Sequence, residues 1–201
     1  MKGLLQKDLI MLWHSCKSFL LLMVVFAGAC LYFPDNPFYM VYPMILSGVL
    51  PVTILSYEER CGWTEYCKIL PLSPKMIVGE KYVFAGITTG TTLVLLAVVQ
   101  SISLGMEGCF AWDALLFRVG ALLALGLFGS ATLLPLMFRF GTEKGRIAYY
   151  ILLGGGCAAS TLLLTQPLSL PSFPGWLLPL GAVILLVGSY ALSVRFYQRK
   201  T

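Results

Sequence analysis

The chain has 201 residues, of which 58% are hydrophobic and 11% are charged, and its formal net charge is +5. Charged residues make up about a quarter of an ordinary soluble domain, so too little polar side chain is present here to coat one. The mean hydropathy of +0.85 agrees with this conclusion. The composition therefore predicts an integral membrane protein and excludes a soluble enzyme or binding domain.

Six apolar runs predict membrane-spanning helices, because each is near the roughly 17 to 25 residues that a helix needs to cross the hydrocarbon core. They cover residues 18–33, 38–57, 82–105, 114–137, 147–165 and 174–194. The first run is treated as a retained span, since the sequence from Ala27 to Phe33 offers no convincing cleavage site for a signal peptide. The predicted fold is an all-α integral membrane domain of six transmembrane helices over residues 1–201.

Lys and Arg gather in the segments that six spans place on one side of the membrane. If both termini share that side, it holds every one of the 14 basic residues except Arg118. Basic loops favour the cytoplasmic face, so both termini and the 58–81 segment are predicted to be cytosolic. Membrane orientation and anionic lipid headgroups then explain the positive charge, and no nucleic-acid partner is expected.

Residues 1–17 mix apolar side chains, Trp13 among them, with charged ones such as Lys7 and Asp8. This pattern predicts an amphipathic helix lying in the inner interface of the bilayer, with Trp13 and Lys17 anchoring the entry to the first span. The alternative is a plain extension of the first span into the cytosol. In both cases the segment is expected to orient the protein and to carry no chemistry.

The 58–81 segment is the most densely charged part of the chain. Within it, Trp63, Tyr66, Cys67 and Leu70 follow the i, i+3, i+4, i+7 spacing of one helical stripe, which predicts a helix of about two turns. Two prolines follow this helix and limit its length. Such an element between two spans either transmits force from a partner or is an ordinary solvated loop, and the spacing leaves both open.

A series of residues in and around this segment carries a family likeness. It comprises Tyr57, Glu58, Glu59, Gly62, Trp63, Tyr66, Leu70, Pro71, Ser73, Val78, Lys81 and Tyr82. The series resembles the cytosolic signature of the ABC-2 type permeases, especially the small six-span members of Gram-positive bacteria. The resemblance extends to the whole chain and implies an amphipathic amino-terminal helix, six spans and a short cytosolic coupling helix between spans two and three.

The same resemblance implies the membrane subunit of an ATP-driven exporter in the bacterial cytoplasmic membrane. In that family two permease chains, identical or related, assemble with two separately encoded ATPase subunits, and the coupling helix seats in a groove of the ATPase. The residues that it assigns to this coupling are Glu58, Glu59, Trp63, Glu65, Tyr66, Lys68 and Leu70. Some relatives export amphipathic or antimicrobial peptides, so a peptide of that kind or another hydrophobic compound is the expected cargo.

The chain itself has no recognisable site for ATP hydrolysis. No phosphate-binding loop of the form G-x-x-x-x-G-K-[ST] occurs, and the GTEKGR sequence at 141–146 has the wrong spacing. We therefore expect a subunit that is not an enzyme and binds no cofactor, with ATP and Mg²⁺ held by the partner ATPase.

Metal, hydrolase and disulfide chemistry are also not expected. The sole histidine, His14, has no partner set for a metal site or a Ser-His hydrolase. On the predicted topology Cys61 and Cys67 are cytosolic and only Cys109 faces outside, which leaves no outer pair for a structural disulfide.

Arg118 is the one basic residue expected inside a span, near its outer end. The charge either snorkels toward Asp113 or a lipid phosphate, or lines the outer part of the translocation path and meets an acidic group on the cargo.

The fifth span contains the sequence GGGCAAS, in which small residues recur four apart and allow helix backbones to approach closely. The residues concerned are Gly154, Gly155, Gly156, Ala158 and Ala159. We favour a dimer seam or a central cavity for this contact, and a contact within one chain remains the alternative.

Two other functions stay open at this stage. A six-span substrate-binding membrane subunit of an importer has similar size and span count, but the AxxxA contact that is typical of its first span is missing here. An intramembrane enzyme has less support, because acid, base and metal ligands are scarce within the spans.

Overall fold

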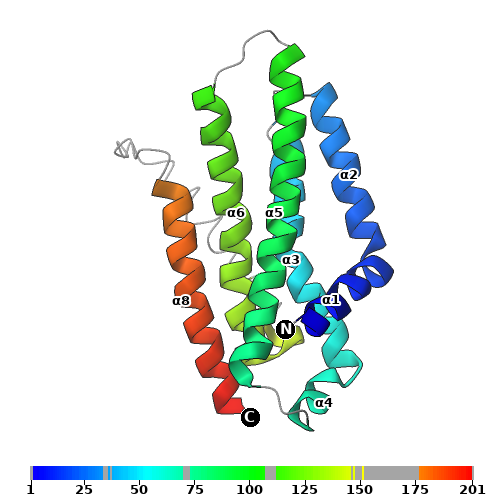
Figure 1. Ribbon diagram of the computed structural model, residues 1–201, viewed down its shortest axis with the longest axis vertical. Helices are drawn as coiled ribbons and strands as arrows, with labels where there is room; N and C mark the ends of the chain where they lie inside the picture. Colours follow the sequence, from blue (N-terminus) through cyan, green and yellow to red (C-terminus); the bar gives the residue numbers. More distant parts are fainter. Residues whose placement is uncertain are drawn as a thin grey trace.

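The computed structural model describes residues 2–33, 36, 38–69, 73–106, 112–145, 147, 151 and 177–200. Its helices are α1 (Lys2–Ser15), α2 (Lys17–Tyr32), α3 (Phe38–Arg60), α4 (Trp63–Ile69), α5 (Pro74–Met106), α6 (Trp112–Phe140) and α8 (Leu177–Lys200). The five long helices run roughly along one axis, and α4 lies at one end of the bundle, which we call the α4 end (Figure 1). Both termini lie in the half of the molecule that holds α4 (Figure 1).

The described helices are those of a membrane protein. Four segments are long and apolar enough to cross a bilayer: Phe38–Arg60, Pro74–Ser103, Leu116–Phe140 and Pro179–Gln198. The pair α1 and α2 is a fifth candidate, although the two helices meet at a bend of 75°. The predicted span at 147–165 and the small-residue run at 154–159 lie outside the described residues. The count of six spans therefore stays a prediction.

The ends of the second and third predicted spans differ from the helices in the structure. The prediction starts the third span at residue 82, because Glu80 and Lys81 are charged, yet α5 begins at Pro74. The preceding helix, α3, continues to Arg60 and so includes Glu58. Glu58 and Lys81 can lie within helices because ion pairs across α1, α3 and α5 compensate their charges. Much of the 58–81 segment is therefore continuous with α3 and α5.

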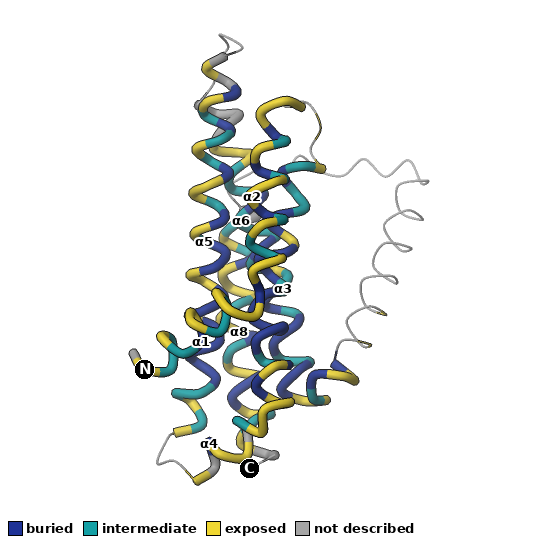
Figure 2. The backbone as a smooth tube through the Cα atoms, turned by 90° about the vertical axis from the view of Figure 1, so that its right-hand side faces the viewer, coloured by how far each residue is buried: buried dark blue, intermediate teal, exposed yellow. Residues whose placement is uncertain are grey.

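The core of the bundle forms around α3, α5 and α6. Helix α6 packs against α3, α5 and α8, and α3 packs in addition against α2 and α5. One buried apolar cluster joins α2, α3, α5 and α6 through Cys30, Met44, Leu96 and Leu122. A second joins α5, α6 and α8 nearer the α4 end, and Figure 2 shows buried positions alternating with exposed ones along the helices. Apolar residues thus face both the core and the outside, as a lipid-embedded bundle requires.

Glycines bring α3 and α6 close together in the middle of the bundle. A Cβ added at Gly48 would lie 3.2 Å from the carbonyl oxygen of Gly126. A Cβ added at Gly126 would lie 2.6 Å from Met44 Cε and 2.8 Å from Thr89 Cγ2, closer than real Cβ contacts allow. A close approach of two helices is therefore present between α3 and α6, while the one predicted for the span at 147–165 lies outside the described residues.

Hydroxyl groups join α5, α6 and α8. The Tyr82 hydroxyl lies 2.6 Å from Ser189 Oγ and 2.7 Å from Ser193 Oγ. Ser189 in turn donates a hydrogen bond of 2.6 Å to the carbonyl oxygen of Ala131. Hydrogen bonds between membrane helices contribute about 0.6 kcal/mol each on average, so this chain of contacts helps to fix α8 against its two neighbours.

Candidate functional site

Five charged side chains from α1, α3 and α5 meet at the α4 end, and we call them the ion cluster: Lys7, Asp8, Glu58, Glu80 and Lys81. Lys81 is central, with its Nζ 2.7 Å from Asp8 Oδ2 and 2.8 Å from Glu58 Oε1. Lys7 pairs with Glu58 and lies 3.3 Å from Asp8 Oδ1. The cluster therefore connects three helices that are far apart in the sequence.

Four members of the ion cluster are almost completely buried. Asp8 is 0% exposed, Glu80 and Lys81 are 1% exposed, and Glu58 is 2% exposed. Charges that are removed from water in this way are tolerated only when they are paired and hydrogen-bonded. The ion pairs consequently hold α1 against α3 and α5 and fix the relative positions of these helix ends.

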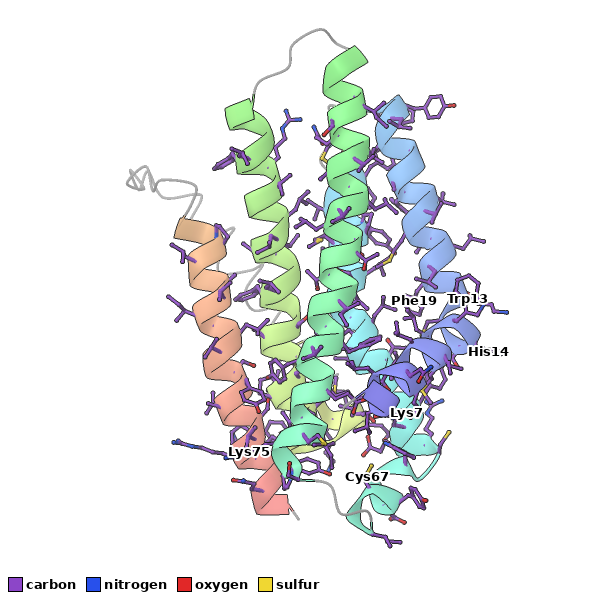
Figure 3. The ribbon with its side chains drawn as sticks, in the orientation of Figure 1. Lys7, Trp13, His14, Phe19, Cys67 and Lys75 are labelled. Carbon is purple, nitrogen blue, oxygen red and sulfur yellow. The ribbon has the colours of Figure 1, made fainter. Side chains whose placement is uncertain are left out.

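Helix α1 has a side that faces the bundle and a side that does not. Lys7 lies on the side toward α3, whereas Trp13 and His14 point away from the bundle (Figure 3). Trp13 and Ile10 are both well exposed, so the outer side of α1 presents large apolar side chains next to the polar His14. The 75° bend at Cys16 turns α1 away from the direction of α2. This geometry is compatible with the predicted interfacial helix.

Glu59 connects α3 to the segment that follows α6. Its Oε2 accepts a hydrogen bond of 3.0 Å from the backbone N–H of Thr142 and a second one from the Thr142 hydroxyl. Gly141, with φ of +81°, makes the turn that presents these donors, and this conformation favours glycine. Both acidic residues that the resemblance assigns to coupling, Glu58 and Glu59, are therefore engaged within the chain.

Helix α4 is the short helix that the stripe of residues predicts. It begins after Gly62, whose φ of +70° allows the sharp turn from α3. Cys67 is buried against the bundle, and the Trp63 ring lies 4.2 Å from Lys7 Nζ in a cation–π contact. Tyr66, which belongs to the same predicted stripe, is instead 54% exposed. One side of α4 is thus attached to the ion cluster and the other is open.

The remaining predicted site residues are spread over the chain. Glu65 is exposed on α4, while the side chain of Lys68 and all of Leu70 lie outside the described part. Arg118 is exposed near the end of α6 that is distant from α4, so its role in a translocation path stays a prediction. The proposed seam residues at 154–159 are likewise not described. The structure therefore brings together the acidic pair and the start of α4, but not the other candidates.

Lys7, Asp8 and Glu80 belong to this site but were not predicted from the sequence as parts of it. On an amphipathic helix, the sequence spacing of an acidic residue is the same whether its side chain faces water or a buried partner. The sequence therefore does not distinguish the two cases. The sequence signal for this contact lies in α5, where Glu80 and Lys81 directly adjoin an apolar run. Charges in that position need compensating charges from elsewhere in the chain. Among the described residues, no group of three or more His, Cys, Asp or Glu side chains is arranged to hold a metal ion.

Comparison with protein families gives one match over nearly the whole chain. Residues 3–198 match the model described as ABC-2 family transporter protein. No curated protein and no solved structure matches the chain significantly. The matched range includes α1, the ion cluster and α4, in agreement with the resemblance that the 58–81 segment suggests. The chain therefore belongs to the ABC-2 family of transporter membrane proteins.

Proposed function

We propose that this ABC-2 family subunit is the permease of an ATP-driven exporter and that α4 is its coupling helix. Permeases of this family work with ATPase subunits and are typically not catalytic themselves. The observation that carries the proposal is the two-sided placement of α4. Its inner side contacts the ion cluster through Trp63, whereas Tyr66 and Ile69 are 54% and 81% exposed.

The ion cluster gives α4 a stiff connection to the bundle. Helix α4 follows α3 through Gly62 and precedes α5, and ion pairs hold both helices to α1. Separating such buried pairs costs several kcal/mol, so a displacement of α4 would move the helix ends as one body. The Glu59 contact with Thr142 extends this connection to the end of α6.

The cargo and the assembly are parts of the same proposal. Two permease chains, identical or related, would form the translocation path in the cytoplasmic membrane with two ATPase subunits. An amphipathic or antimicrobial peptide, or another hydrophobic compound, is the proposed cargo. Membership of a transporter family favours this function over the importer receptor and the intramembrane enzyme.

The exposed side of α4 is the surface that we expect the ATPase to contact. A Tyr66→Ala/Ile69→Ala variant removes two exposed apolar side chains there and leaves Trp63, Cys67 and the ion cluster in place. Truncating an aromatic hot-spot residue at an interface costs about 2 kcal/mol or more, so we expect copurification with the ATPase to fall at least tenfold. For this test, an ABC ATPase subunit is co-expressed with the chain and captured through a tag.

The matched control for this experiment is Tyr32→Ala. Tyr32 is 84% exposed at the end of α2 that is distant from α4. This variant should copurify with the ATPase as the native chain does. Undiminished copurification and transport in the α4 variant would rule out α4 as the coupling surface.

The proposed orientation predicts which side of the membrane Cys61 faces. Cys61 is exposed beside α4, whereas Cys67 is buried and desolvation raises the pKa of its thiol, so Cys67 should react slowly with maleimides. In a variant that retains only Cys61, we expect a membrane-impermeant maleimide to label inside-out vesicles and to leave intact cells unlabelled.

A variant that retains only Cys109 is the control for orientation. Cys109 is predicted to face outside, so its labelling should have the opposite pattern, with modification in intact cells. Labelling of Cys61 from the outside would place α4 on the wrong face for an ATPase and would contradict the proposal.

A further inference from the structure

The ion cluster contains three carboxyl groups but only two ammonium groups. Both ammonium groups, on Lys7 and Lys81, pair with Glu58. Both also lie within 3.3 Å of the carboxyl group of Asp8. The third carboxyl group belongs to Glu80, and the nearest ammonium nitrogen, Lys81 Nζ, lies 4.0 Å from its Oε1. Glu80 is therefore the acid of the cluster that has no cation of its own.

Glu80 is also buried without a hydrogen-bond donor on one of its oxygens. The residue is 1% exposed, and its Oε1 has no hydrogen-bond partner among the described residues. The distance of 4.0 Å to Lys81 Nζ is beyond hydrogen-bond length, and this ammonium group already donates to Asp8 and Glu58. The same oxygen is shielded from water. An ionised carboxyl group is costly to bury in this way, whereas a neutral carboxylic acid costs much less.

The other side chains around Glu80 supply no further positive charge. A cavity of about 100 Å³ lies beside it, and Lys81 is the one cation among the described residues that line this cavity. Outside the ion cluster, the titratable side chains of the lining come from α3, α4 and α8 and belong to Glu59, Cys67 and Tyr197. Glu59 adds a further carboxyl group, which accepts hydrogen bonds from Thr142. The surroundings of Glu80 thus disfavour a third negative charge in the cluster.

We propose that Glu80 holds a proton in the folded protein at neutral pH. The ion cluster then consists of two carboxylates, two ammonium groups and one neutral carboxylic acid, and its charges balance. The cavity beside Glu80 has room for a few water molecules, through which the proton could exchange with the solvent at the α4 end.

The proton makes the contact between α1, α3 and α5 sensitive to pH. Its removal leaves an uncompensated negative charge beside the carboxylates of Asp8 and Glu58, so the cluster should hold the three helices less firmly at high pH. In the orientation proposed above, the pH that matters is that of the cytosol. Only this link to the cytosol rests on the proposed function. The proton on Glu80 depends neither on the orientation nor on the coupling role of α4.

Infrared spectroscopy of the purified full-length chain tests for the proton directly. A neutral carboxyl group has a C=O stretching band that a carboxylate lacks, and dodecyl maltoside has no carbonyl group of its own. At neutral pH, where an ordinary glutamate is ionised, we expect the band in the native chain and its loss in Glu80→Gln. Glu143→Gln changes an exposed glutamate and should keep the band. A native spectrum without the band, or an unchanged band in Glu80→Gln, would overturn the proposal.

The stability of two matched variants provides a second test. Glu80 and Glu58 are 1% and 2% exposed, but only Glu58 pairs with both ammonium groups. Glu80→Gln imitates the protonated side chain, so its midpoint of unfolding by sodium dodecyl sulfate at neutral pH should equal or exceed the native one. Glu58→Gln removes a paired charge, so its midpoint should fall. If Glu80→Gln does not fold, or loses as much as Glu58→Gln, Glu80 is ionised and the proposal is wrong.

The pH dependence of the same midpoint provides a third test. The unfolded chain releases the proton of Glu80 near the ordinary glutamate value of about pH 4.3, whereas the folded chain retains it. Because the folded state then binds more protons, this group makes the native chain less stable as the pH rises above that value, and Glu80→Gln lacks the effect. The midpoint of Glu80→Gln should therefore increase relative to the native midpoint between about pH 4.3 and neutral pH. A constant difference over this range would contradict the proposal.

Discussion

Lys81→Met is expected to destabilise the protein by about 3–5 kcal/mol, the usual effect of removing one partner from a buried ion pair. The substitution leaves Asp8 and Glu58, which are 0% and 2% exposed, without the ammonium group that lies within 2.8 Å of both. Lys7 is the other cation beside them, and its side chain is 25% exposed. The free energy of unfolding would be measured by titration with sodium dodecyl sulfate in dodecyl maltoside micelles, followed by circular dichroism.

Lys75→Met provides the matched control on the same helix. Lys75 is exposed in the first turn of α5, so the same change of residue type should alter the free energy of unfolding by no more than about 0.5 kcal/mol. Adding Asp8→Asn to Lys81→Met should cost less than the two single changes together, because the two residues contact each other. Equal stability of the Lys81→Met and Lys75→Met variants would mean that the ion cluster does not hold the helices.

Gly126→Leu is expected to destabilise the bundle by about 1–3 kcal/mol through overpacking, or by more if α3 and α6 separate. Even the first added carbon would lie 2.6 Å from Met44 Cε and 2.8 Å from Thr89 Cγ2. The flexible end of Met44 can shift, but the remaining carbons of leucine need further space between Met44 and Thr89. The same titration measures the change.

Gly86→Leu separates packing from helix propensity. Gly86 lies in α5, and a Cβ added there meets nothing within 4 Å. Both substitutions gain the same intrinsic preference of leucine for a helix, worth up to about 1 kcal/mol. Gly86→Leu should therefore be neutral or stabilising. A Gly126→Leu variant as stable as Gly86→Leu would show that the α3–α6 contact is looser than the structure indicates.

The sequence predicts those parts of this fold that depend on hydrophobic length. Helices α3, α6 and α8 overlap the predicted spans, because a long apolar run has few other stable arrangements in a bilayer. The short helix α4 was also predictable at Trp63–Ile69, because a glycine and two prolines flank a helical spacing. The family resemblance predicted three residues of the candidate site, namely Glu58, Glu59 and Trp63.

The rest depends on contacts between distant segments, which a single sequence does not specify. Asp8 and Lys81 are 73 residues apart, and no sequence pattern around either residue indicates that they form a pair. The extension of α5 back to Pro74 depends on the same pairing, since unpaired charges would have favoured a loop. The α3–α6 contact involves an isolated Gly48 and a Gly126–Gly129 spacing of three, whereas the usual sequence pattern of close membrane helices has small residues four apart.

The pairing of Asp8 with Lys81 also constrains how the protein is made. Translation proceeds from the amino terminus, so α1 leaves the ribosome long before its partner on α5 has been synthesised. During that interval Asp8 has no buried counter-ion and is best accommodated in water or among lipid headgroups. The ion pair between α1 and α5 can consequently form only after α5, the third long helix, has been inserted.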